Sequence, residues 1–464
     1  MPTSQKKIIY NAFTHVTLSH QSHGQWRRPE AQDQRNFSRL EPWVRLARIA
    51  ERGKLDTIFF ADTVGVYDTW RGGWETVARE GMQFPSNDPA SLISALGYAT
   101  RNLGFVVTSS IIQEHPFNFA RKMSTLDHLT DGRVGWNIVT SYLDNAARNF
   151  GLDHLPLHDD RYAWAGEYAE VVYKLWEASW EDGAVVTDTA AGIYADPAHI
   201  HAINHKGPRY SVAGPHLPQP SPQRTPVLFQ AGASRAGRDF AARHAEVTFL
   251  PAVTPEALRA DIADLNGRVV RGGRKVGDLK YLTMIHPIIG STEAEAQARH
   301  REFLEWRLEE SYFAHASGSI GFDLSKIDPA TPLKDVHSEY TQGGLKALID
   351  AAPDRNATFG DVVQKRLNKP VVGTPEQIAD EIARWVEAGI DGFNLVPVVT
   401  PDWFEEFVDG VVPVLRSRGL IQSDYAEGTL REKLGGRAVL DDSHPARRLR
   451  PWAADQTPRE EAVS

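Results

Sequence analysis

The stretch GRVGWNIVTSYLDNAARNFG, residues 132–151, joins an apolar strand to a polar exit. Residues 134–139 are apolar apart from Asn137, and three hydroxyl residues, Thr140, Ser141 and Tyr142, follow them. A buried amide must find hydrogen-bond partners, because leaving it without them costs about 1–3 kcal/mol. We therefore interpret this segment as a core strand whose end faces a bound ligand.

Strand-like and helix-like segments alternate on both sides of this stretch. Amphipathic helical patterns follow the apolar runs, for example over residues 39–52, 115–130 and 160–180. We expect strands over residues 7–14, 57–63, 103–111, 133–141, 226–232, 246–252, 279–290 and 391–397. Apolar strands alternating with helices indicate a parallel sheet covered by helices. Eight such units predict an α/β fold, a (β/α)8 TIM barrel, and a doubly wound open sheet is the alternative.

Turn and cap signals divide the chain further. Thr254-Pro255 and Thr400-Pro401 each pair an N-cap residue with a proline, and the segment 374–377 has the pattern of a capping box. The segments 182–224 and 312–372 are too long for ordinary connections of about 2–6 residues. We interpret them as insertions near the site in a single barrel domain, 1–464, with a C-terminal extension over 421–464.

The composition excludes several classes of protein. The net charge of −9 argues against a nucleic-acid partner, and the absence of cysteine excludes disulfides and thiolate chemistry. No run approaches 18 apolar residues, and the N-terminus lacks the apolar stretch of a signal peptide. We expect a cytoplasmic protein without a membrane segment.

The histidines have a loosely ligand-like spacing. They form two sets, His15, His20 and His23, and then His199, His201 and His205. Neither set matches a zinc pattern such as H-E-x-x-H, so we expect no metal site. The sequence also contains no G-x-S-x-G, no P-loop and no dinucleotide fingerprint after a strand.

Polar residues gather where the predicted strands end, which in a TIM barrel is the end that builds the active site. They include Asp62, Thr108, Asn137, Ser141 and the run Gln230–Ser234. Such uncharged donors and acceptors suit a ligand with carbonyl groups and ring nitrogens, although each residue could also cap a turn or helix. Gly232 and Ser234 at a helix start favour a phosphate, because free amide groups there bind anions.

Longer motifs resemble one enzyme family across residues 7–450. They include NAF (11–13), FFADTVGVYD (59–68), STLDHLTDGRVGWNIVTS (124–141), HDDRY (158–162), SPQRTPVLFQAGASRAGRDFAA (221–242) and GIDGFNL (389–395). The chain resembles the flavin-dependent monooxygenases that include the nitrilotriacetate and dibenzothiophene-sulfone enzymes, within the bacterial-luciferase superfamily. Within that family it most resembles the long-chain alkane and dimethyl-sulfide monooxygenases.

The resemblance implies a cofactor and a set of site residues. Reduced FMN would come from a separate NAD(P)H-dependent flavin reductase, and the enzyme would act on a small molecule with dioxygen as a homodimer or homotetramer. The FMN-binding residues would be Asp62, Thr108, Asn137, Ser141, Tyr162, Gly232, Ala233 and Ser234. The catalytic residues would be His20, Tyr67, Gln83, Tyr142 and His315, whereas Phe13 and Trp70 suggest an apolar substrate wall.

The substrate remains open at this point. The alkane enzyme has histidine where this chain has Tyr142 and cysteine where it has Thr17, so alkanes, alkyl sulfides, sulfones and aminopolycarboxylates are all candidates. A riboflavin-cleaving lyase, a reductase that uses a deazaflavin, and a flavin-binding protein without turnover are the alternatives to a monooxygenase.

Overall fold

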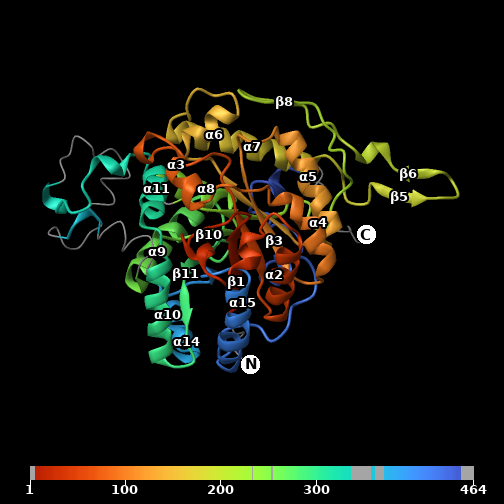
Figure 1. The fold of residues 1–464 in the computed structure, drawn as a ribbon. Helices are drawn as coiled ribbons and strands as arrows, with labels where there is room; N and C mark the ends of the chain where they lie inside the picture. Colours follow the sequence, from red (N-terminus) through yellow and green to blue (C-terminus); the bar gives the residue numbers. More distant parts are fainter. Residues whose placement is uncertain (1–5, 233, 252–253, 336–356, 361–369, 451–464) are drawn as a thin grey trace. The chain divides into compact units, whose positions relative to one another are not determined.

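The computed structural model describes residues 6–232, 234–251, 254–335, 357–360 and 370–450. Eight parallel strands form a closed barrel in the order β1-β14-β11-β10-β9-β4-β3-β2 (Figure 1). Their bounds are β1 (Ile9–His15), β2 (Thr57–Ala61), β3 (Gly104–Ser110), β4 (Val134–Val139), β9 (Val227–Gln230), β10 (Val247–Phe249), β11 (Lys280–Ile285) and β14 (Gly392–Leu395). The predicted TIM barrel is confirmed, and the open-sheet alternative is wrong.

Helices follow the barrel strands (Figure 1). The α-helices are α1 (Gln32–Arg35), α2 (Glu41–Arg52), α3 (Glu75–Glu80), α4 (Ala90–Ala99), α5 (Pro116–Leu129), α6 (Asp144–Asn149), α7 (His158–Ala178), α8 (Arg235–His244), α9 (Pro255–Arg271), α10 (Glu293–Trp306), α11 (Glu309–Ile320), α14 (Pro375–Glu387), α15 (Asp402–Glu406), α16 (Val412–Ser417) and α17 (Leu430–Lys433). A π-helical turn over Phe407–Val411 joins α15 to α16.

The opening stretch forms β4, as its apolar pattern predicts. Trp136 is buried and packs on Phe119 at a ring-centre distance of 4.6 Å, and its indole N–H donates to the Ser109 carbonyl at 3.1 Å. Asn137 pairs in register with Phe229 of β9 and is 5% exposed. The amide therefore lies in the buried barrel wall.

Two local predictions need correction. The strand expected over 279–290 is two strands, since β11 ends at Ile285 and β12 (Pro287–Ile289) pairs with β13 (Val371–Gly373) outside the barrel. The helix after Thr400-Pro401 begins at Asp402 with Pro401 at the N-cap position, so Thr400 does not cap it. The Thr254 cap and the capping box at 374–377 are confirmed.

Short elements occupy the two predicted insertions. Residues 182–224 contain two small antiparallel sheets, one of β5 (Val185–Asp188) with β6 (Ile193–Ala195), the other of β7 (His205–Lys206) with β8 (Ser211–Val212). The expected insertion over 312–372 begins inside helix α11, and its residues 336–356 and 361–369 lie outside the described residues.

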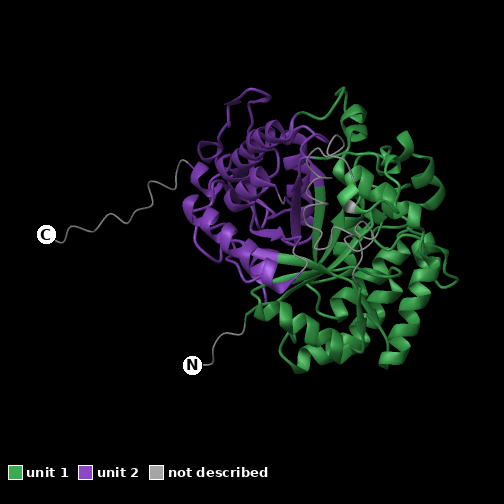
Figure 2. Ribbon diagram, turned by 90° about the vertical axis from the view of Figure 1, so that its left-hand side faces the viewer, with its two compact units in different colours: residues 1–108, 141–156, 282–425 green, residues 109–140, 157–281, 426–464 purple. Residues whose placement is uncertain are grey.

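The chain divides into two compact units, coloured separately in Figure 2. Unit 1 comprises residues 1–108, 141–156 and 282–425, and unit 2 comprises 109–140, 157–281 and 426–464.

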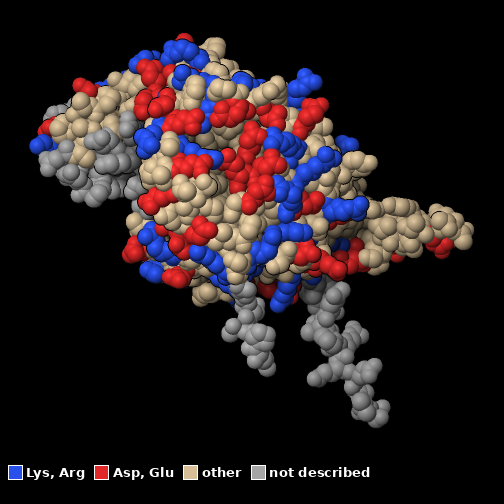
Figure 3. Space-filling model, turned by 60° about the horizontal axis from the view of Figure 1, so that its bottom comes forward, with Lys and Arg blue, Asp and Glu red and all other residues tan. Residues whose placement is uncertain are grey.

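Acidic and basic side chains are interspersed on the face drawn in Figure 3. This face therefore offers no continuous basic stripe of the kind that follows a nucleic-acid backbone. Among the helices that the structure describes, none combines the length and the apolarity needed to cross a membrane.

The capping box of α14 gives a stability prediction. The Thr374 hydroxyl accepts from the Gln377 amide N–H at 3.4 Å, and the Gln377 side chain accepts from the Thr374 amide N–H at 3.0 Å. We expect Thr374→Ala to lower the free energy of unfolding by about 1 kcal/mol. Urea denaturation measures it, with Thr125→Ala on an exposed turn of α5 as the control that loses no cap.

Candidate functional site

A chain of hydrogen-bonded histidines lies at the core of unit 1. Nε2 of His23 lies 3.1 Å from Nδ1 of His315, and Nδ1 of His23 lies 3.1 Å from the Ser19 hydroxyl. His23 is fully buried, and His315 on helix α11 is 9% exposed. Since each neutral imidazole has one donor and one acceptor nitrogen, the partner at Nδ1 fixes which ring nitrogen of His315 carries the proton.

Two tyrosines adjoin this chain. The hydroxyls of Tyr67 and Tyr142 are hydrogen-bonded to each other, and the Tyr67 ring stands edge-on to His315 at 5.3 Å between ring centres. Tyr67 is 2% exposed, whereas Tyr142 is 44% exposed. Desolvation raises the pKa of Tyr142 to about 12 and raises that of Tyr67 well above its usual range, so both hydroxyls keep their protons near neutral pH.

His20 joins the same group through its ring. It packs edge-on against Phe13 at 4.5 Å and against His15 at 5.7 Å, and its Nδ1 is buried without a hydrogen-bond partner among the described residues. Gln83 donates from Nε2 to the His20 carbonyl at 2.9 Å. Gln83 therefore supports the backbone of His20 through this bond.

Other predicted residues of unit 1 take neighbouring or supporting places. Asp62, just after β2, lies 3.3 Å from Nε2 of His15 at the end of β1. Trp70 stacks on Phe313 of α11 at 5.6 Å, so this ring packs against the helix that carries His315. Thr17 donates to the Pro85 carbonyl at 2.6 Å.

Burial keeps these imidazoles neutral. It lowers the pKa of His315 to about 4, and it lowers the pKa values of His20 and His23 well below their usual range, with neighbouring imidazoles adding to the effect. A neutral imidazole carries no charge that water would have to solvate, so it can exchange a proton or hydrogen bond with a neighbour inside a buried site. The group suits chemistry that must exclude water.

The shifted pKa of His315 predicts a pH-dependent stability. The unfolded chain takes up a proton near pH 6.5 and the folded chain only near pH 4, so stability falls as the pH drops through this range. Between pH 6.5 and 5.5 the loss from this group is about 1 kcal/mol. Urea denaturation at both pH values should give a shallower dependence for His315→Gln, and an identical slope would contradict the shift.

A small polar cluster of unit 2 lies between β9 and α8. We call it the cradle, and it comprises Thr140, Tyr162, Gln230, Gly232, Ser234 and Gly237. The Ser234 hydroxyl caps α8 by accepting from the Gly237 amide N–H at 3.0 Å. A Cβ atom on Gly232 or Gly237 would come within 2.9 or 2.7 Å of the Tyr162 hydroxyl. Glycine at both positions therefore lets the Tyr162 hydroxyl approach the backbone closely.

Gln230 and Tyr162 complete the cradle. Oε1 of Gln230 is buried and has no hydrogen-bond partner among the described residues. The Tyr162 hydroxyl interacts with the side chains of Ser234, Thr140 and Gln230. Burial is the largest cause of the raised pKa of Tyr162, so it remains a neutral hydrogen-bond donor.

The remaining predicted cofactor residues lie at or near strand ends. Thr108 is buried in β3, and Asn137 is buried in β4. Ser141 follows β4 with a left-handed backbone φ of 62°. Ala233 lies outside the described residues.

Several residues of these groups had no predicted role. Ser19 and His23 belong to the histidine chain, His15 lies between Asp62 and the His20 ring, and Gly237 and Thr140 belong to the cradle. The spacing of His15, His20 and His23 was visible in the sequence, but the only role weighed for it was a metal site, which we did not expect. Among the described residues, no group of three or more His, Cys, Asp or Glu side chains could hold a metal ion.

The family model described as luciferase-like monooxygenase matches residues 13–392. The chain belongs to this family. It is 46% identical over 448 residues to the long-chain alkane monooxygenase of Geobacillus thermodenitrificans, with 96% of this chain and 98% of that protein covered. It is 43% identical to the dimethyl-sulfide monooxygenase of Hyphomicrobium sulfonivorans, with 96% and 94% covered. The resemblance found in the motifs is confirmed.

Solved structures agree with this assignment. The crystal structure of long-chain alkane monooxygenase has a TM-score of 0.88 at 44% identity, and the alignment covers 96% of this chain and 100% of that one. A riboflavin lyase crystallised with modified FMN and riboflavin has a TM-score of 0.87 at 37% identity, with 96% and 100% covered. This member of the luciferase-like family is a flavin-dependent oxidoreductase of the monooxygenase class.

Proposed function

We propose that this enzyme is a two-component monooxygenase. It takes reduced FMN from a separate NAD(P)H-dependent flavin reductase and uses dioxygen to oxygenate a small organic substrate of the alkane, alkyl sulfide or sulfone class. The observation that carries this proposal is the buried group of neutral imidazoles, His20, His23 and His315, beside the Tyr67–Tyr142 pair. Such a group can handle protons while it keeps water out.

The cradle of unit 2 fits the phosphate of FMN. The Ser234-capped start of α8 offers amide groups, and Tyr162, held close to Gly232 and Gly237, offers a hydroxyl. Ser141 and Ala233 would complete the phosphate set, and Asp62, Thr108 and Asn137 would hold the ring and the ribityl chain. When bound, reduced FMN supplies the electrons that activate dioxygen.

The residues of unit 1 would manage protons and orientation. His315 presents a neutral imidazole whose tautomer is set by His23, and His20 offers a second one with a free buried Nδ1. Tyr67 and Tyr142 would orient the substrate through their linked hydroxyls. His315 and His20 would hold or donate a proton at the reacting oxygen.

The apolar side of the substrate site would be formed by Phe13 and Trp70. Both are at least nine-tenths buried, and Phe13 contacts His20 directly. Tyr142 adds a hydroxyl to this surface. A substrate with a polar sulfur or sulfone group beside an alkyl part would use both kinds of contact, which favours alkyl sulfides and sulfones over plain alkanes.

An oxygen-uptake assay tests the proposal. The enzyme is mixed with FMN, NADH, a flavin reductase and one candidate substrate at a time, and both oxygenated product and hydrogen peroxide are measured. We expect product formation that depends on reduced FMN. Absence of product with every substrate class, together with no change in FMN fluorescence on adding the protein, would remove the proposal. Light scattering would test the expected homodimer or homotetramer.

Riboflavin cleavage is the second candidate function, because the riboflavin lyase covers 96% of this chain at 37% identity. In this case riboflavin is the substrate in the presence of reduced FMN and air. Chromatography in the same assay would measure the loss of riboflavin, which distinguishes riboflavin cleavage from the monooxygenase reaction.

A further inference from the structure

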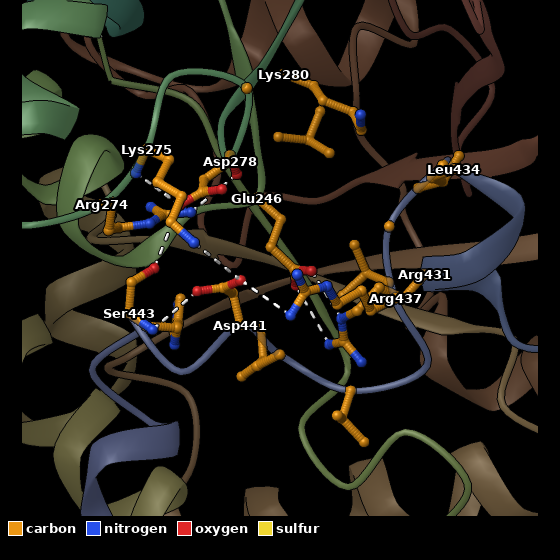
Figure 4. A pocket seen from close by; sticks show the side chains of 18 residues that line it. Glu246, Arg274, Lys275, Asp278, Lys280, Arg431, Leu434, Arg437, Asp441 and Ser443 are labelled. Carbon is orange, nitrogen blue, oxygen red and sulfur yellow. Dashed lines mark hydrogen bonds and ion pairs between the residues drawn. The ribbon is translucent and has the colours of Figure 1, made fainter. Parts of the chain in front are cut away.

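A second cavity lies in unit 2. It is at the N-terminal ends of the barrel strands, whereas the cradle follows the C-terminal end of β9. It has a volume of about 300 Å³ and is bordered by the first residues of three barrel strands, Val227, Val247 and Lys280. Residues of the C-terminal extension, between Arg431 and His444, form the rest of its wall (Figure 4). The proposed flavin chemistry gives this cavity no role.

Positive side chains outnumber negative ones in its lining. The cationic side chains are those of Arg274, Lys275, Lys280, Arg431 and Arg437, and the carboxylates are those of Glu246, Asp278 and Asp441. His444 adds no charge, because its Nε2 donates to the His244 carbonyl at 2.8 Å and its Nδ1 accepts from the Ala446 amide at 3.1 Å. The cavity thus has an excess of two positive charges.

Arg274 is a buried cation that lacks a salt bridge to any carboxylate of the described residues. It is 5% exposed, and its Nη groups donate only to main-chain carbonyls, those of Ala242, Ala245 and Asp278, at 2.8–2.9 Å. Its Nε is buried without an acceptor among the described residues. The carboxylates of Glu246 and Asp278 attract its charge without a direct ion pair to either, so its buried Nε is available to an added anion.

Arg431 offers a second unused donor. It pairs with Glu246 through Nε at 2.7 Å and with the Thr225 carbonyl through Nη2 at 2.7 Å, while its buried Nη1 has no acceptor among the described residues. Figure 4 shows Arg431 and Glu246 together at the cavity wall. Two guanidinium groups therefore line one space, each with a buried N–H left over.

The other cations are unevenly neutralised. Arg437 and Lys275 share Asp441, at 3.4 and 4.0 Å, whereas Lys280 forms no salt bridge with the described residues. Asp278 accepts from the Lys275 amide and from the Ser443 hydroxyl. Lys280 is therefore a cation of the lining whose charge no carboxylate of the described residues pairs with.

We propose that this cavity binds a phosphate group, either as inorganic phosphate or as a small phosphate monoester. Planar guanidinium N–H groups match phosphate oxygens, and the ammonium of Lys280 adds a point charge. A volume of about 300 Å³ accommodates a phosphate with a few attached carbon atoms but not a dinucleotide. The bound anion would link the C-terminal extension to the strands β10 and β11.

Titration calorimetry tests this site, with inorganic phosphate and glycerol 3-phosphate as the two probes. The protein is first saturated with oxidised FMN, so that the cradle of β9 and α8 does not compete for phosphate. We expect both probes to bind the wild type, and the tighter one identifies the source. Lys280→Gln and Arg437→Gln should each weaken binding about tenfold, which corresponds to the loss of one charge-assisted hydrogen bond.

Arg259→Gln is the matched control, because Arg259 is an exposed residue of α9 that does not border the cavity. Its affinity for phosphate should equal that of the wild type. Equal affinity in all four proteins, or no heat of phosphate binding to the wild type, would overturn the proposal. Ser234→Ala should keep the phosphate affinity even where it loses FMN, so the two proposals fail independently.

Discussion

Gly237→Ala should weaken FMN binding about 100-fold. A Cβ atom on Gly237 would lie 2.7 Å from the Tyr162 hydroxyl and 2.9 Å from Cα of Gly232. The second neighbour is backbone, so the strain cannot be relieved by rotating a side chain, and such overpacking typically costs 1–3 kcal/mol or more. The displaced groups are those that we propose for the FMN phosphate. Quenching of FMN fluorescence measures the dissociation constant.

Gly166→Ala is the control for this change. Gly166 lies in the middle of α7, and a Cβ atom there would meet no atom within 4 Å. Alanine should therefore stabilise the helix by about 0.5–1 kcal/mol without affecting FMN. If Gly237→Ala and Gly166→Ala bind FMN with equal affinity, the cradle of β9 and α8 is not the phosphate site.

The barrel could be predicted because its strands are local apolar runs. Segments such as TIFFA, 57–61, are buried along nearly their whole length, so no long-range information was needed to recognise them. The break after Ile285 is marked in the sequence only by His286 and Pro287 inside a mostly apolar run, and pairing with β13 takes β12 out of the barrel. At Thr400-Pro401 the residue types matched a cap, but the helix begins one residue later and Pro401 takes the N-cap position.

The sequence named candidate site residues but not the contacts between them. His20, Tyr67, Tyr142 and His315 were expected from the family resemblance, and all four lie in unit 1. The bond between His23 and His315 joins residues 292 apart, and no spacing rule reveals such a partner. Likewise, the lining of the second cavity combines strand starts with the C-terminal extension, which only the folded chain brings together.

The two histidines of the chain have different roles: His315 contacts the site residues, and His23 positions His315. His315 lies against Tyr67, whereas His23 is fully buried and reaches the site through His315. When Nε2 of His23 donates to Nδ1 of His315, the remaining proton of His315 is on its Nε2. The Ser19 hydroxyl is compatible with this arrangement, since it can donate to Nδ1 of His23. In this arrangement His23 presents the Nε2–H of His315 as a hydrogen-bond donor.

His315→Ala should lower the rate of product formation by about 10²–10⁴-fold, the usual contribution of a positioned acid or base. Oxygen uptake should continue, because the proposed FMN phosphate contacts lie in the cradle of unit 2, so hydrogen peroxide should replace the product. The ratio of product to peroxide is the measurement. It separates a proton-transfer defect from loss of FMN, which would lower both.

Two further variants make this prediction specific to the chain of His315 and His23. His154→Ala, at a 78% exposed histidine of unit 1, should leave the ratio unchanged. His23→Gln keeps a side-chain amide that can donate to Nδ1 of His315, so it should retain more coupling than His23→Ala. Equal coupling in these two His23 variants would show that His23 only fills space. Unchanged coupling in His315→Ala would exclude His315 from the reaction.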